Sequence, residues 1–137
     1  QSQSTSNPCS ITQAAGVMAL NGPQDFIIHQ KDTFQKRRDL MINLLKSCDL
    51  LDIYIPQGAF YLYVGCQKAL GYKTSSNHLL TTDGDIAQHL LTDSGVAVVP
   101  GEAFGFSPYL RLSYAMDHET LKKAAHRILD FFNKLIK

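Results

Sequence analysis

The stretch GVAVVPGEAFGFSPYLRLSYA, residues 95–115, constrains the fold more than any other part of the chain. It begins with an apolar run rich in β-branched residues, 96–99, which predicts a buried strand. Pro100-Gly101 predicts the end of that strand, because proline has no amide proton for the ladder and glycine permits a turn. A loop with one more glycine, Gly105, and a proline follows, and 109–114 predicts a second strand. Two strands joined by a glycine-rich loop are therefore expected here.

Arg111 lies in the middle of the second of these strands. The alternation of side chains along a strand places Arg111 on one face with Tyr109 and Ser113, and the neighbouring leucines on the other. A guanidinium group offers a planar fork of donors that matches a carboxylate, and a strand holds such a fork rigidly. From the residues alone, an ordinary surface arginine paired with a carboxylate is the commoner explanation of this pattern.

Composition argues against several classes of function. The chain has 137 residues, of which 45% are hydrophobic, and a formal net charge of +1. Its length predicts one domain with a sizeable core. The near balance of charge gives no indication of nucleic acid or an anionic membrane as a partner. No apolar run approaches the length of a membrane span, and the polar start QSQSTSNPCS does not resemble a signal peptide.

The cysteines and histidines predict neither a disulfide framework nor a metal site. Cys9, Cys48 and Cys66 are an odd number without CxxC spacing, so free thiols in a reducing cytoplasm are expected. The histidines are scattered, and His118 and His126 are eight residues apart on one predicted helix, which is too far for a metal-binding pair. We therefore expect no metal ion.

The remaining segments predict helices around a small mixed sheet, in an α/β (mixed α+β) arrangement. Ser10 is a favourable N-cap for a helix that ends at Asn21-Gly22, and Pro23 opens a longer linking helix. The later elements are a strand over 48–55, a strand over 59–64, a polar loop over 66–82, a helix capped by Asp83 or Asp85, and a closing helix capped by Asp117.

Four sequence motifs together resemble the class I/II aminotransferases, which are pyridoxal-phosphate enzymes of fold type I. These motifs are VVPG-x-AFG, Y-x-RLSYA, P-x-GAFY and the opening Gln-Ser-x-x-Thr-Ser-Asn segment. Each alone is weak, but they occur in the family's order and cover nearly the whole chain. The start and end of the chain are most similar to those of bacterial aspartate aminotransferases. The resemblance implies the small C-terminal domain of such an enzyme.

The resemblance also implies a domain organisation and a set of site residues. Residues 1–21 correspond to the end of the large domain and an interface helix, and 22–137 to the small domain. Arg111 corresponds to the arginine that binds the α-carboxylate of the amino-acid substrate, and Phe60 to an aromatic residue at the border of the substrate pocket. The alternative is that Phe60 is part of the core, which its alternation with Tyr61 and Tyr63 allows, and we favour the pocket slightly.

Ser6 and Asn7 match a segment that in the family lies near the cofactor of the neighbouring subunit. The same resemblance implies a cytoplasmic homodimer that uses pyridoxal 5'-phosphate and acts on L-amino acids and 2-oxo acids. The Schiff-base lysine, the acid at the pyridine nitrogen and the phosphate loop of the family belong to the large domain. We therefore expect no catalytic lysine in this chain, and no transaminase activity from this chain alone.

Two other classes of function stay open at this point. An enzyme of the same fold with other chemistry, such as a carbon–carbon lyase or an acyl-CoA condensing synthase, would also hold a carboxylate with a C-terminal arginine. A binding or interaction module without catalysis would show the same apolar patterns. In one branch of the family, an arginine near the first segment binds the side-chain carboxylate of the substrate. Here that stretch has Ser2 and Ser4 and no arginine. The preferred amino acid is thus open.

Overall fold

Residues 7–137 are described by a computed structural model of the chain. The chain divides into two units, Gln1–Asp32 and Thr33–Lys137. The division falls within helix α2 (Asp25–Leu45), whereas the sequence predicts a domain boundary before that helix, at residue 22.

Helix α1 (Ser10–Asn21) lies in the first unit and buries none of its residues. Its N-cap is Cys9, which makes no side-chain cap, so the prediction that Ser10 caps this helix is wrong by one position. The carbonyl oxygen of Cys9 accepts a hydrogen bond from the amide of Gln13 at 3.0 Å, which makes Ser10 the first helical residue. Large apolar side chains on α1 are exposed: Ile11, Val17, Met18 and Leu20.

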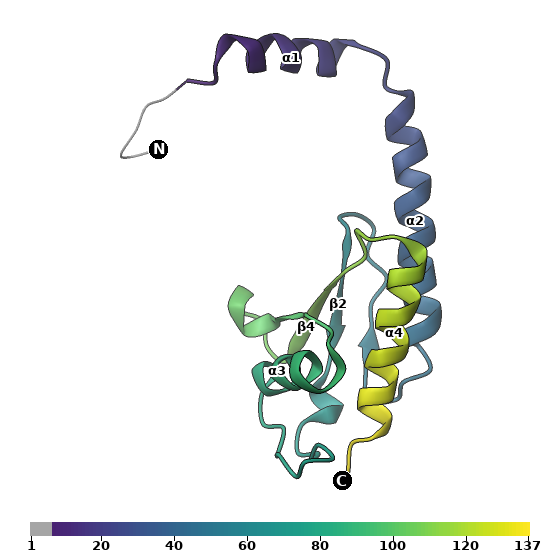
Figure 1. Cartoon of the computed structure of the whole chain (residues 1–137), viewed down its shortest axis with the longest axis vertical. Helices are drawn as coiled ribbons and strands as arrows, with labels where there is room; N and C mark the ends of the chain where they lie inside the picture. The colour runs from purple at the N-terminus through teal and green to yellow at the C-terminus, as the bar shows by residue number, and fades with distance from the viewer. Residues whose placement is uncertain (1–6) are drawn as a thin grey trace. The chain divides into compact units, whose positions relative to one another are not determined.

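The second unit is built on a four-stranded sheet in the order β1-β2-β4-β3. Its strands are β1 (Asp52–Ile53), β2 (Tyr61–Gly65), β3 (Val99–Pro100) and β4 (Tyr109–Ser113). The fold class is confirmed, but the sheet is antiparallel at every pairing rather than mixed. Figure 1 shows β2 and β4 side by side, and they form the longest pairing.

Two predicted strands are shorter than expected because their backbone groups are used in turns. The amides of Gly95 and Val96 bond to carbonyl oxygens of Leu91 and Leu90, which ends helix α3 (Asp83–Ser94) instead of starting a strand. Gly95 takes a left-handed conformation, with φ 64°, as such helix ends require. Only Val99–Pro100 therefore pairs, and the proline is tolerated because β3 is an edge strand.

Near residue 48 the amide of Cys48 bonds to the carbonyl oxygen of Leu45, and the amide of Leu51 to that of Cys48. These turns delay the strand until β1. The loop over 66–82 contains the short 3₁₀ helix η1 (Gln67–Ala69) and is tied to the C-terminal end by a pair of backbone hydrogen bonds between Lys73 and Ile136.

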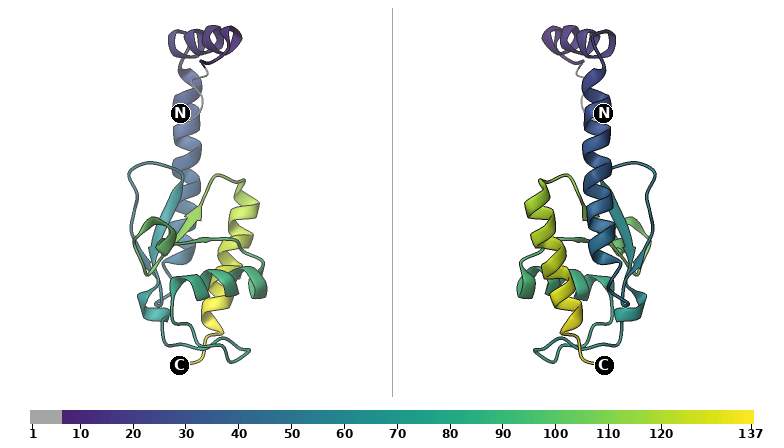
Figure 2. Two further views of the ribbon diagram at one scale, coloured as in Figure 1. Left: turned by 90° about the vertical axis from the view of Figure 1, so that its left-hand side faces the viewer. Right: turned by 90° about the vertical axis from the view of Figure 1, so that its right-hand side faces the viewer.

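Helices cover one face of the sheet and leave the other open. Alternate side chains of β2 and β4 are buried on the covered face: Leu62, Val64, Leu110 and Leu112. They belong to one core cluster with residues of α2, α3 and α4 (His118–Asn133), including Met41, Leu45, Ile86, Leu90, Leu121, Ile128 and Phe132. Figures 1 and 2 show α4 beside the sheet, with α3 packed against it.

Side-chain caps fix where α3 and α4 begin. Asp117 accepts a hydrogen bond from the amide of Thr120, which confirms it as the N-cap of α4. For α3, the N-cap is Thr82, which forms a capping box with Asp85, so neither predicted aspartate holds the cap position itself. Asp83 is fully buried, and its side chain accepts hydrogen bonds from the amides of Glu102 and Tyr109 instead.

Candidate functional site

The open face of the sheet carries Arg111 among aromatic side chains. The register of β2 and β4 pairs Arg111 with Tyr63 and Ser113 with Tyr61. Because side chains alternate, these four share the face opposite the leucine core. Arg111 is half-buried, as are Tyr61 and Tyr63. The predicted position of Arg111, mid-strand on a rigid element, is thus the position that it occupies.

The guanidinium of Arg111 contacts two aromatic rings. Its Cζ atom is 5.5 Å from the ring centroid of Tyr61 and 4.9 Å from that of Phe104. Phe104 belongs to the 3₁₀ helix η2 (Gly101–Phe104), in the loop that joins β3 to β4. Both distances are within the range of cation–π attraction. Among the residues that the structure describes, Arg111 has no hydrogen-bond or ion-pair partner.

This arrangement leaves the donors of Arg111 available. Aromatic faces attract the charge of a guanidinium but accept its N–H groups only weakly, so its donor edge stays free for an anion. Carboxylate is the anion that matches its fork with two parallel hydrogen bonds. A surface arginine paired with a protein carboxylate is therefore not the arrangement found at Arg111 within residues 7–137.

A stack of aromatic rings continues the open face beyond Arg111. The rings of Tyr63 and Tyr109 stack at 5.2 Å, and Phe106 stacks on Tyr109 at 4.6 Å. The hydroxyl of Tyr63 donates to the carbonyl oxygen of Phe106 at 3.0 Å. Burial and the nearby charge of Asp83 raise the pKa of Tyr63, so this hydroxyl remains a neutral donor. The stack and this hydrogen bond hold Phe106 of the loop between β3 and β4 against β2 and β4.

Phe60 lies just before β2 and is 55% exposed, so it is not part of the core. Its ring meets that of Tyr61 edge to face, with centroids 6.0 Å apart, and Tyr61 in turn contacts Arg111. The residue before it, Ala59, has φ 62°, which is unfavourable for a residue with a Cβ. Tyr114 stabilises this conformation, because its hydroxyl donates to the carbonyl oxygen of Ala59 at 3.1 Å.

A second support of the same turn comes from α2. Arg38 donates to the carbonyl oxygen of Pro56 at 3.1 Å and pairs with Asp39 at 2.7 Å. Pro56 begins the P-x-GAFY motif, so Arg38 fixes the segment that presents Phe60.

The two other predicted site residues lie apart from this group. Ser6 is outside the described residues. Asn7 is exposed and lies in the segment before α1. Their relation to a cofactor of a neighbouring subunit stays a prediction.

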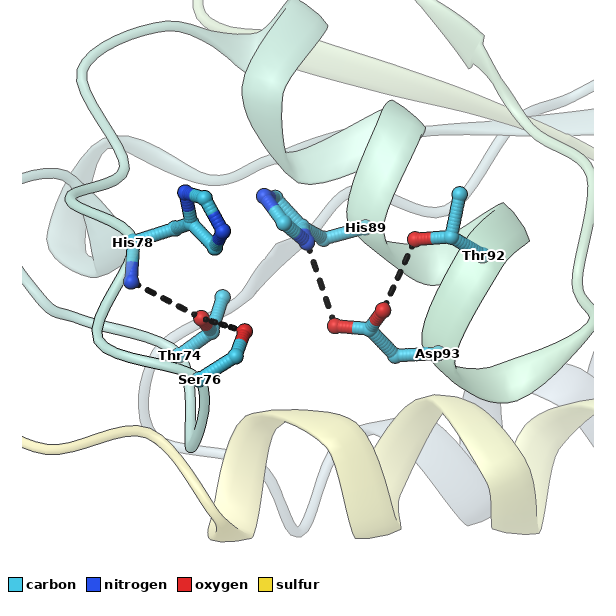
Figure 3. A network of polar contacts seen from close by, with 6 residues as sticks. All are labelled: Thr74, Ser76, His78, His89, Thr92 and Asp93. Atoms are coloured by element: carbon cyan, nitrogen blue, oxygen red, sulfur yellow. Dashed lines mark hydrogen bonds and ion pairs between the residues drawn. The ribbon is translucent and has the colours of Figure 1, made fainter.

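A separate polar network lies between the loop over 66–82 and α3 (Figure 3). The rings of His78 and His89 have centroids 5.1 Å apart, and Nδ1 of His89 is 3.1 Å from a carboxylate oxygen of Asp93. A hydrogen bond from the Thr92 hydroxyl, and then His89, lower the pKa of Asp93. These residues are on other elements than Arg111, and within the network the loop meets the helix through the contact of the two histidine rings.

No group of three or more histidine, cysteine, aspartate or glutamate side chains within residues 7–137 is placed to bind a metal ion. Among the same residues, no helix combines the length and apolarity needed to cross a membrane. Cys48 and Cys66 are buried free thiols, and Cys9 is exposed and free. Burial raises the pKa of Cys66 to about 12, so its thiol is unreactive.

Comparison with known proteins places the chain in a family. A family profile described as aminotransferase class I and II matches residues 1–128. The chain belongs to the class I and II aminotransferases. Members of this family use pyridoxal phosphate.

The family relatives include curated bacterial proteins. The chain is 53% identical, over 93% of its length and 31% of the relative's, to the aspartate aminotransferase of Rhizobium meliloti (strain 1021). It is 51% identical, over the same shares, to a probable aspartate/prephenate aminotransferase of Rickettsia felis. The crystal structure of the Rhizobium meliloti aspartate aminotransferase superimposes with a TM-score of 0.93 and 51% identity, covering 98% of this chain and 34% of that one. The chain thus spans about a third of the length of these aminotransferases.

Sequence reasoning missed three residues around Arg111. Tyr61 and Phe104 contact its guanidinium, and Asp83 binds the loop that carries Phe104. The alternation along β2 could have placed Tyr61 on the face of Arg111, had the pairing of β2 with β4 been known. Phe104 lies in an irregular loop, and Asp83 binds that loop from α3. No periodic sequence pattern predicts either contact.

Proposed function

We propose that the protein containing this chain is a pyridoxal-phosphate-dependent aminotransferase, most similar in activity to aspartate aminotransferase. It would transfer an amino group between an L-amino acid and a 2-oxo acid. The observation that supports this most is Arg111, whose donor edge is free of protein partners within the described residues, in a chain that belongs to this family.

In this proposal Arg111 binds the α-carboxylate of the substrate. Two parallel, charge-assisted hydrogen bonds fix the plane of the carboxylate as well as its position. The contacts of the guanidinium with Tyr61 and Phe104 restrict its rotation before substrate arrives, which lowers the entropy lost on binding. Phe60, linked to Arg111 through Tyr61, would border the side chain of the bound substrate.

Pyridoxal phosphate, when bound, supplies the electron sink that makes the α-proton of the amino acid acidic. The site consists of the Arg111 guanidinium and the aromatic rings that contact it, and this combination suits a carboxylate rather than the cofactor. We infer that the lysine that holds the cofactor lies outside this segment. We also propose that Ser6 and Asn7 lie near the cofactor of a neighbouring subunit, in a cytoplasmic homodimer in which 1–21 belongs with the large domain and 22–137 forms the small one.

The test uses the full-length protein. After addition of pyridoxal phosphate and reduction with borohydride, the labelled peptide is identified by mass spectrometry. Transamination is then measured with L-aspartate and several 2-oxo acids, prephenate among them because some relatives are named for it. We expect one labelled lysine outside residues 1–137 and a new amino acid formed from each accepted 2-oxo acid.

The same experiment separates the alternatives. A labelled lysine with carbon–carbon cleavage or acyl transfer in place of transamination would indicate another enzyme of this fold. Absence of any labelled lysine would mean that the protein is not a pyridoxal-phosphate enzyme, and that Arg111 serves a non-catalytic binding surface.

A further inference from the structure

Asp83 is a buried carboxylate whose hydrogen bonds run to the loop beside Arg111. It is the first residue of α3 and is 0% exposed. One of its oxygens, Oδ2, accepts a hydrogen bond from the amide of Tyr109 at 3.1 Å and another from the amide of Glu102 at 3.3 Å. Its other oxygen, Oδ1, is buried without a partner among the described residues.

The start of α3 does not need this carboxylate. Thr82 and Asp85 form the capping box of α3, so the usual reason for an aspartate at a helix start is already satisfied. The positive end of the helix dipole makes a carboxylate in the first turn tolerable. A fully buried carboxylate with only one oxygen satisfied is still a costly choice for stability alone. The energetic cost points to a role at the loop.

The two amides that Asp83 binds belong to the two elements that build the site. Glu102 is in η2, which carries Phe104, and the Phe104 ring centroid lies 4.9 Å from the guanidinium carbon of Arg111. Tyr109 is the first residue of β4, two residues before Arg111 and on the same face. A single oxygen atom therefore joins the element that carries the ring to the strand that carries the arginine.

Two neighbours hold the loop: Tyr63 of β2, whose hydroxyl bonds to the carbonyl oxygen of Phe106, and Asp83 of α3. The loop closes on itself, since the amide of Phe106 bonds to the carbonyl oxygen of Gly101 at 3.1 Å and that of Gly105 to Glu102 at 2.9 Å. These local bonds shape the loop but do not attach it to α3. Asp83 makes the hydrogen bonds that attach it, from a helix that is anchored in the core by Ile86 and Leu90.

We propose that Asp83 is a positioning residue that fixes the Phe104 ring relative to the Arg111 guanidinium, and so sets the affinity of the site for the substrate carboxylate. The proposal rests on the carboxylate-binding role of Arg111 given above. Without Asp83 the loop keeps its contacts with Tyr63 but loses its hydrogen bonds to α3, so the Phe104 ring is held less firmly against the guanidinium.

The test compares Asp83→Ala and Asp83→Asn with Asp85→Ala in the full-length enzyme loaded with pyridoxal phosphate. Asp83→Ala removes the acceptor and leaves two amides unpaired, whereas Asp83→Asn keeps the shape and one carbonyl oxygen. Asp85→Ala is the matched control, because it weakens the capping box of the same helix without touching the loop between β3 and β4. The readouts are KM and kcat for the amino acid, and the Kd of succinate by calorimetry.

For Asp83→Ala we expect the KM and the succinate Kd to rise about ten- to a hundredfold, with kcat changed far less. Asp83→Asn should fall between wild type and Asp83→Ala, and Asp85→Ala should stay near wild type. Combined with Arg111→Lys, the Asp83→Ala change should add little, since both act on the same interaction. Equal effects of Asp83→Ala and Asp85→Ala, a loss confined to kcat, or full additivity with Arg111→Lys would each overturn the proposal.

Amide hydrogen exchange separates this proposal from the proposed function. Peptides that cover 101–109 should exchange faster in Asp83→Ala and Asp83→Asn than in Asp85→Ala, whether or not the enzyme transaminates. If the wild-type enzyme does not transaminate, the proposed function fails, and the succinate Kd still tests the link between Asp83 and the carboxylate site. Faster exchange with an unchanged succinate Kd would show that Asp83 holds the loop without positioning Arg111.

Discussion

Replacement of Arg111 by lysine tests the site most directly, because it keeps the charge and removes the fork. Lysine can make one charged hydrogen bond where arginine makes two, and the lost bond contributes about 1.5–3 kcal/mol. The contacts of the guanidinium with Tyr61 and Phe104 contribute about 0.5–1 kcal/mol more at a half-exposed site. We therefore expect Arg111→Lys to lose about 2–4 kcal/mol of transition-state binding, which is roughly a 30- to 1,000-fold decrease in kcat/KM.

The assay is steady-state transamination by the full-length enzyme, with the amino-acid concentration varied. Most of the loss should appear as a higher KM for the amino acid, because the carboxylate is bound in both the ground state and the transition state. Absorbance of the bound cofactor should be unchanged, since no residue near Arg111 is proposed to hold it.

Arg127→Lys is the matched control. Arg127 is exposed on α4, on the covered side of the sheet, and the substitution is chemically the same. Its kinetics should equal those of the wild type. If Arg111→Lys retained kcat/KM within about threefold, less than 1 kcal/mol, the carboxylate assignment of Arg111 would be refuted.

Three further predictions concern the stability of the full-length enzyme. Gly101→Ala should lower the free energy of unfolding by about 1–3 kcal/mol, measured by urea denaturation, because an added Cβ would lie 2.1 Å from a backbone oxygen. Tyr114→Phe should cost about 0.5–1.5 kcal/mol in the same measurement, since it removes the hydrogen bond to the carbonyl oxygen of Ala59; no change would mean that this bond does not hold the turn. A hydrogen bond from the Thr81 hydroxyl lowers the pKa of Asp85 from 3.8 to about 2. The stability that the Asp85 carboxylate adds as the N3 partner in the capping box, about 1 kcal/mol, is therefore complete above pH 4 and lost as the pH falls through 2. The difference in unfolding free energy between wild type and Asp85→Asn should follow that pH range, and a difference independent of pH would contradict it.

Local patterns in the sequence predicted much of the second unit. Alternation along 109–114 placed Arg111 on a strand face away from the leucines, and the structure confirms this. The N-cap at Asp117 and the helix that follows were also predicted correctly, because a cap and a helical period are properties of a few neighbouring residues.

The predictions failed where backbone groups had two possible partners. The run 96–99 has the composition of a strand, but the Val96 amide completes the end of α3 and so is not available to the sheet. Asp83 and Asp85 are equally good caps by composition. Only the fold decides that Asp85 serves the helix and Asp83 serves a loop about twenty residues further along the chain.

The sequence by itself determined the fold class, the face on which Arg111 lies and the family to which the chain belongs, since these follow from periodicity and from short motifs. The tertiary structure decided which residues meet Arg111. Tyr61 reaches it through strand pairing, Phe104 through the path of a loop, and Asp83 through the packing of a helix against that loop. Such contacts join residues far apart in the chain, and no local pattern specifies the partner of a side chain across that distance.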